Sequence, residues 1–275
     1  MNLNGLIQKY IESGYEEAEA SSKVCQDIIL LKLSKSEFKK FITIKGGVVL
    51  HSISKDNRRA TRDMDIDFIK YSLDDEHIKI FIDKLNNVDD GIKVYIVGNI
   101  IKLHHQDYDG KRVSIKIIDN YDNTINSKLD IGVHKEFDIE QDDYCFDINI
   151  IDKSAHLLIN SKEQIFVEKL KSLLKFGIRS TRYKDIFDFY YLINYGRLNK
   201  NKLLRYIDIL IFKDEMFDEN NINDICIRIK LILNNRRYKS MLSNRDNNWI
   251  EIPVDEVINS ILEYFEELKN IEVYN

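Results

Sequence analysis

The chain changes its hydrophobic pattern once, near residue 155, and this change restricts the possible folds more than any other feature. Helical spacing before residue 41 gives way to short β-rich runs, which continue to Asp152 around one helical stretch at 74–87. Helical segments then follow at 161–175, 183–195, 201–212 and 253–270. We therefore predict an α+β fold, with a mixed α/β sheet domain at 1–155 and a helical C-terminal domain at 156–275.

The composition narrows the class of protein. Of 275 residues, 44% are hydrophobic and 32% charged, which argues against both a disordered chain and a membrane protein. No apolar run reaches the roughly 18 residues of a membrane-spanning helix, and acidic residues come too early for a secretory signal. The formal net charge of −5 disfavours a protein that coats nucleic acid but is compatible with a local basic patch. The cysteines are far apart and form no zinc-binding pair.

Three aspartates alternate with apolar residues in one short segment. In a strand, alternate side chains share a face, so Asp63, Asp65 and Asp67 point to one side. The apolar residues point to the other side, toward the core: Met64, Ile66 and Phe68. Carboxylates about 6 to 7 Å apart repel each other, and a divalent cation removes that penalty. Mg²⁺ binds carboxylate oxygens together with the phosphates of a substrate.

Two glycines precede the aspartates by some 15 residues and predict a phosphate site. An apolar run at 41–45 ends in Gly46 and Gly47, and residues 48–54 have helical character. Glycine allows backbone N–H groups to approach a ligand, and a helix N-terminus favours negative charge. The combination of these glycines with the following aspartates indicates a nucleotide more strongly than either does alone.

A further carboxylate, Asp130, lies on another predicted strand. There Asp130 faces away from the apolar side formed by Leu129 and Ile131. Asp130 either completes a carboxylate triad with Asp63 and Asp65 or is a solvated edge residue. The role of Asp67 is equally open between a metal ligand and a residue beyond the site.

The helical half places two charges inside apolar stripes. At helical spacing, Lys169 falls within the apolar stripe of its helix, and Asp185 does so on the next. Buried charges are costly unless they are paired or used. The two side chains either form a buried ion pair that stabilises the helical domain or point into a cleft, and the two possibilities are compatible. The loop between these helices carries Arg179 and Arg182, which suit phosphates or RNA, or are simply solvated.

These segments resemble the nucleotidyltransferase motifs of the AbiEii/AbiGii toxin family. The first block is Lys-Gly-Gly at 45–47, Arg-Ala-Thr-Arg-Asp-Met-Asp at 59–65 and Lys-Leu-Asp at 128–130. Residues 165–170 (Ile-Phe-Val-Glu-Lys-Leu) and 179–190 are similar to the second block, which includes a T-R-x-x-D-x-x-D-x-Y pattern. Order and spacing agree over about residues 40–195, and no recognisable motif follows.

The resemblance implies a nucleotidyltransferase fold of the DNA polymerase β type, in which the helical domain closes the active-site cleft. It also implies a bacterial cytoplasmic toxin of a type IV toxin–antitoxin pair, with a winged-helix antitoxin encoded nearby as a possible partner. By position, Asp63 and Asp65 correspond to the metal-binding pair, and Asp130 matches the third strand aspartate less securely. Thr61 corresponds to the hydroxyl residue before the pair. In the helical domain, Lys169 and Asp185 correspond to catalytic residues.

The predicted function is nucleotidyl transfer from an NTP to RNA, with the 3′ end of tRNA as the leading acceptor. Mg²⁺ or Mn²⁺ is expected at Asp63, Asp65 and Asp130, and Lys45 and Arg59 are expected to steady the triphosphate. Asp130 or Asp185 would orient or deprotonate the acceptor hydroxyl, and Lys169 would stabilise the transferring phosphoryl group. Two alternatives remain: an acceptor that is a protein or a small molecule such as an antibiotic, and a non-catalytic nucleotide-binding or RNA-binding module.

Overall fold

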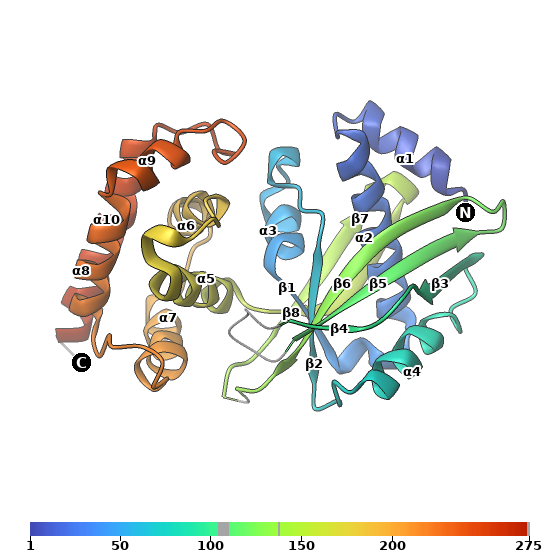
Figure 1. Ribbon diagram of the computed structural model, residues 1–275, viewed down its shortest axis with the longest axis horizontal. Helices are drawn as coiled ribbons and strands as arrows, with labels where there is room; N and C mark the ends of the chain where they lie inside the picture. The colour runs from blue at the N-terminus through green and yellow to red at the C-terminus, as the bar shows by residue number, and fades with distance from the viewer. Residues whose placement is uncertain (104–109, 137, 274–275) are drawn as a thin grey trace. The chain divides into compact units, whose positions relative to one another are not determined.

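The computed structural model describes residues 1–103, 110–136 and 138–273. This part of the chain divides into two compact units, Met1–Asn160 and Ser161–Asn275 (Figure 1). The first unit combines a mixed sheet with helices, and the second is helical. The predicted fold class, a mixed α/β sheet domain with a helical C-terminal part, is confirmed.

Within the described residues, eight strands form one sheet in the order β3-β5-β6-β2-β1-β8-β7, with β4 paired to β5. Their bounds are β1 Ile42–Lys45, β2 Met64–Ile69, β3 Ile92–Ile96, β4 Ile101–Leu103, β5 Gly110–Asp119, β6 Thr124–His134, β7 Asp142–Ile148 and β8 Lys153–Ile159. The pairs β1–β8 and β2–β6 are parallel, and the other paired strands run antiparallel. The acidic strand β2 therefore lies inside the sheet, between β1 and β6.

Helices cover the apolar face of this sheet. The helices of the first unit are α1 Leu3–Glu12, α2 Glu17–Lys35, α3 Gly46–Ser54 and α4 Asp75–Leu85, with 3-10 turns η1 Glu37–Lys40, η2 Asn57–Arg59 and η3 Asn149–Ile151. Helix α2 packs on β6 and β8, and α4 packs on β3. The ring of Phe68 on β2 meets that of Phe81 on α4 with 5.2 Å between centroids. As predicted, Met64, Ile66 and Phe68 are buried.

Strand β8 corrects one prediction, because the β-rich runs do not end at Asp152. In β8 the side chains of Ala155, Leu157 and Ile159 are buried, while that of His156 is exposed. This is the alternation of a strand with one covered face. The segment lies directly before a helix and is rich in leucine and isoleucine, so its period is hard to distinguish locally. Pairing with β1 and β7 decides its conformation.

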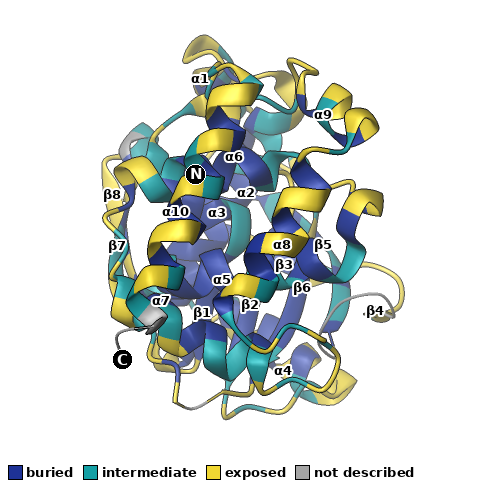
Figure 2. Cartoon of the chain, turned by 90° about the vertical axis from the view of Figure 1, so that its left-hand side faces the viewer, coloured by how far each residue is buried: buried dark blue, intermediate teal, exposed yellow. Residues whose placement is uncertain are grey.

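The second unit is built from helices with one apolar face each. They are α5 Lys162–Phe176, α6 Lys184–Tyr195, α7 Lys200–Ile207, α8 Ile222–Leu233, α9 Arg236–Leu242 and α10 Val254–Val273, with η4 Gly177–Arg179 and the π-helical turn η5 Asp208–Phe212. Helices α8 and α9 were not among the predicted segments. Helix α10 packs on α6 and α8, and Figure 2 shows the exposed and buried faces of α8 and α10. Of the helices described, none combines the length and the apolar character needed to cross a membrane.

Candidate functional site

The sheet register brings the predicted acidic residues together on one face. Asp65 of β2 lies beside Asp130 of the parallel strand β6, and Lys45 of β1 lies opposite Asp65. Paired residues on neighbouring strands point to the same side of a sheet. Asp63 immediately precedes β2 and is exposed. We call Asp63, Asp65 and Asp130 the acidic cluster.

The two glycines lie directly against this cluster. Gly46 has a left-handed φ of 65°, and a Cβ atom there would lie 2.6 Å from Oδ2 of Asp65. A Cβ atom on Gly47 would lie 2.8 Å from Cβ of Thr61. Only glycine fits such close approaches without displacing a neighbour. The structure thus gives the glycines a role that the sequence did not suggest: they make room for the side chains of Asp65 and Thr61.

Helix α3 begins at the same place and adds backbone donors. It starts at Gly46, and in the described structure no side chain caps its N-terminus. The first N–H groups of a helix have no partner within the helix, and they carry partial positive charge. The backbone N–H groups at the N-terminus of α3 are therefore suited to donate hydrogen bonds to phosphate oxygens beside Asp65.

Asp67 lies on the same face but is engaged elsewhere. Its Oδ1 forms an ion pair of 2.8 Å with Nζ of Lys45, and both side chains are only 7% exposed. The structure thus places Asp67 in a buried ion pair next to the acidic cluster. Arg59, the last residue of η2, is also buried and lies within electrostatic range of His51 on α3.

Arg112 is a site residue that the sequence analysis missed. Its Nε and Nη2 donate to Oδ1 and Oδ2 of Asp130, each at 2.7 Å. The pair with Asp130, and the nearby charges of Asp63 and Asp65, raise the pKa of the guanidinium further above its already high value. A sequence signal existed: the Asp-Asn-rich turn at 119–123 joins β5 to β6, and counting back equally along both strands places Arg112 opposite Asp130.

A divalent cation fits two of the three acids better than all three. Both oxygens of Asp130 already accept hydrogen bonds from a cationic side chain. Within the described ranges, no group of three or more His, Cys, Asp or Glu residues is arranged to hold a metal ion. Mg²⁺, however, commonly takes one or two carboxylates and completes its shell with water and substrate phosphates. Asp63 and Asp65 match that smaller requirement.

The helical unit contains a second charged cluster, formed by Lys169, Asp185 and Asp188. Lys169 of α5 is 9% exposed, forms an ion pair with Asp185 of α6, and lies 3.0 Å from Oδ2 of Asp188. Asp188 is fully buried, and its Oδ1 accepts a hydrogen bond of 3.1 Å from Nε1 of Trp249. The predicted pair of Lys169 and Asp185 thus exists. Asp188, which sequence analysis did not assign, follows Asp185 by three residues and shares its helix face.

The two predicted RNA-binding arginines are exposed. Arg179 ends η4, and Arg182 lies in the loop before α6. The hydroxyl oxygen of Ser180 accepts a hydrogen bond of 3.3 Å from the backbone N–H of Arg182, which helps to shape the loop. Both guanidinium groups are accessible to a polyanion.

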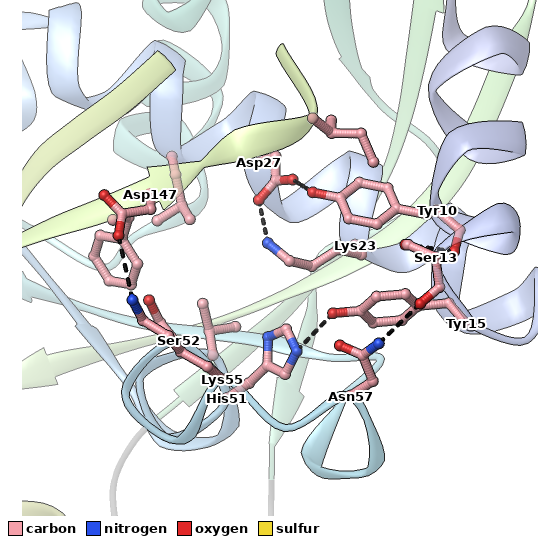
Figure 3. Close-up of a pocket in the computed structure, with 14 residues that line it drawn as sticks. Tyr10, Ser13, Tyr15, Lys23, Asp27, His51, Ser52, Lys55, Asn57 and Asp147 are labelled. Atoms are coloured by element: carbon pink, nitrogen blue, oxygen red, sulfur yellow. Dashed lines mark hydrogen bonds and ion pairs between the residues drawn. The ribbon is translucent and has the colours of Figure 1, made fainter. Parts of the chain in front are cut away.

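A cavity of about 410 Å³, lined by apolar and polar side chains, lies in the first unit (Figure 3). Its polar groups bind one another: Asp27 accepts from Tyr10 and Lys23, and the hydroxyl of Tyr15 lies 2.9 Å from Nε2 of His51. Burial, together with nearby cations, lowers the pKa of His51 to about 4. The described residues that line the cavity include none of the predicted site residues. We therefore interpret the polar side chains that line this cavity as a hydrogen-bond network that stabilises the fold.

Comparison with known proteins agrees with this geometry. The family model described as "Nucleotidyl transferase AbiEii toxin, Type IV TA system" matches residues 28–248, which is more than half of the chain. The matched span runs from within α2 to a point before α10 and includes every predicted site residue. No curated protein matches the chain.

Proposed function

Because the chain belongs to the family of AbiEii nucleotidyl transferase toxins of type IV toxin–antitoxin systems, we propose that it transfers a nucleoside monophosphate from an NTP to RNA. The 3′ end of tRNA is the first acceptor to test. One observation carries the proposal: the glycines that open α3 pack directly against Asp65 and Thr61. A phosphate-binding helix end and a carboxylate that can hold a cation therefore share one place.

The residues of the first unit would bind and orient the NTP. Asp63 and Asp65 would hold Mg²⁺ or Mn²⁺, which when bound neutralises charge on the triphosphate. The backbone N–H groups at Gly46 and Gly47 would donate to phosphate oxygens, and the hydroxyl of Thr61 would lie beside them. Arg59 is buried and would contribute positive potential at the triphosphate, whereas the charge of Lys45 is offset by its ion pair with Asp67.

The helical unit would serve the acceptor. We propose that the helical domain, predicted from about residue 156 onward, closes over the acidic cluster. The acceptor hydroxyl oxygen would then attack the α-phosphorus, and pyrophosphate would leave. Lys169 would stabilise charge on the transferring phosphoryl group. We assign the role of proton acceptor to Asp185 and not to Asp130, because Arg112 engages both oxygens of Asp130, whereas the ion pair of Asp185 with Lys169 uses Oδ1. Arg179 and Arg182 would contact RNA phosphates.

Family membership implies an antitoxin partner as well as a nucleotide substrate. We propose that this antitoxin is a winged-helix protein encoded nearby, and that the pair acts in the bacterial cytoplasm. Expression of the chain alone should arrest growth, and co-expression of the neighbouring gene should relieve the arrest. Growth arrest that persists with the neighbour would contradict the assignment of that partner.

The acceptor is tested by following the label from each α-³²P-labelled NTP. The protein is incubated with Mg²⁺ and a cell extract, which is then separated into RNA, protein and small-molecule fractions. Label in RNA, concentrated in tRNA, is the expected result. Label in the protein or small-molecule fraction identifies the alternative acceptors. Binding of NTP without any transfer would show a non-catalytic module and refute the proposed reaction.

A further inference from the structure

Arg112 places a fixed positive charge inside a cluster that would otherwise contain only acids. Its side chain reaches from β5 to Asp130 of β6 and binds both carboxylate oxygens at 2.7 Å. The side chain of Asp130 is 3% exposed, whereas that of Arg112 is 32% exposed. A planar guanidinium that binds a carboxylate through two parallel hydrogen bonds is strongly held. Arg112 is thus part of the site's architecture.

The formal charges of the acidic cluster and Arg112 match a single divalent cation. Asp63, Asp65 and Asp130 contribute three negative charges, and Arg112 cancels one of them. The neighbouring Lys45–Asp67 ion pair is neutral as a unit. The acidic cluster together with Arg112 has a formal charge of two negative units, which equals the charge of one divalent ion in magnitude.

A second metal ion at Asp130 would compete with Arg112. It would need oxygens that the guanidinium already occupies, and it would lie beside a like charge. Such repulsion is strong at the short distances within a partly buried site. Two-metal sites place their ions about 3.5–4 Å apart and share carboxylates between them. Asp130, the third carboxylate of the cluster, is engaged through both oxygens by an arginine.

We propose that Arg112 takes the place of a second metal ion in this chain, so that the acidic cluster holds one divalent cation at Asp63 and Asp65. Asp130 then positions Arg112 instead of binding metal. The inference rests on the proposed function for the identity of the site, but it concerns the number of cations and not the reaction.

A Mn²⁺ titration, monitored through the electron paramagnetic resonance signal of the free ion, measures directly how many divalent cations the chain binds. In the presence of a non-hydrolysable α,β-methylene NTP analogue, the wild-type chain should bind one Mn²⁺. Arg112→Gln frees Asp130, so Mn²⁺ binding to the protein alone should tighten at least about tenfold. The double variant Arg112→Gln with Asp130→Asn should return to the wild-type affinity.

Arg58→Gln is the matched control, because Arg58 also binds an aspartate through two nitrogens, at 3.1 and 2.9 Å from the oxygens of Asp56. It should leave Mn²⁺ affinity unchanged. Two Mn²⁺ ions per wild-type chain, or equal affinity in wild type and Arg112→Gln, would overturn the inference. The wild-type stoichiometry stands even if Arg112→Gln does not fold. Failure of label transfer with one bound Mn²⁺ would refute the proposed reaction and leave this inference intact.

Discussion

Substitution of Gly46 by alanine should disrupt the candidate site more than it disrupts the fold. A left-handed backbone costs a residue with a Cβ atom about 1–2 kcal/mol, and the φ of Gly46 is 65°. The new Cβ atom would also lie 2.6 Å from Oδ2 of Asp65, so the carboxylate must move. Overpacking of this kind typically costs a further ~1–3 kcal/mol. We therefore expect Gly46→Ala to lower the free energy of unfolding by about 2–5 kcal/mol.

Gly98→Ala separates the backbone cost from the contact. Gly98 has a similar φ of 71°, and no described atom lies within 4 Å of the position of its Cβ. Gly98→Ala should therefore lower the free energy of unfolding by only ~1–2 kcal/mol, the cost of the backbone conformation, and keep wild-type NTP binding. Gly46→Ala should lose NTP binding.

Urea denaturation followed by far-UV circular dichroism compares the two variants. Fluorescence is less suitable, because the single tryptophan, Trp249, belongs to the other compact unit. Equal destabilisation of both variants, or unchanged NTP binding in Gly46→Ala, would refute the argument that Gly46 makes room for Asp65.

Three further predictions concern buried charges and are checked by chemical denaturation. The pKa of His51 in the folded state is about 4, instead of 6.5, so the free energy of unfolding should fall by up to about 3 kcal/mol as pH drops from about 6.5 to 4. His51→Gln should flatten this pH dependence. An unchanged slope in the variant would contradict the role of His51. Lys32 is fully buried, so Lys32→Ala should lower the free energy of unfolding by about 3–5 kcal/mol. Lys213 is exposed, and Lys213→Ala should lower it by at most about 1 kcal/mol. Similar losses in the two variants would contradict the prediction. Asp188→Asn should destabilise the chain more than Asp185→Asn, because only Asp188 is fully buried. The reverse order would contradict the argument that the more deeply buried carboxylate contributes more to stability.

The spacing of apolar residues along the sequence predicted those strands and helices that bury one face. In strand β2 the apolar side chains are buried as expected, because that face packs against helices, although Asp67 on the opposite face is buried too. Helices α5 and α6 likewise have the predicted apolar stripes. Strand β8 was missed, because its pairing with β1 comes from tertiary structure more than from its own residues.

The partners of the charged residues were harder to predict than their positions. Sequence placed Asp65 and Asp130 on two strands, with Asp130 either near Asp65 or at a solvated edge, and the register shows that the two residues lie side by side. It did not show that Arg112 binds Asp130 or that Lys45 binds Asp67. Such pairs depend on which strand lies next to which, and on the register between them. An alternation pattern within one strand carries neither piece of information.

Transfer of label from α-³²P-NTP by Asp65→Asn tests the central claim most directly. Asp143→Asn is the matched control, because Asp143 is an exposed aspartate on strand β7 of the same sheet. We predict that Asp65→Asn loses label transfer by at least about 10²-fold, as expected for loss of a cation-binding group, while Asp143→Asn keeps the wild-type rate. Equal rates in the two variants would show that nucleotidyl transfer does not depend on the acidic cluster.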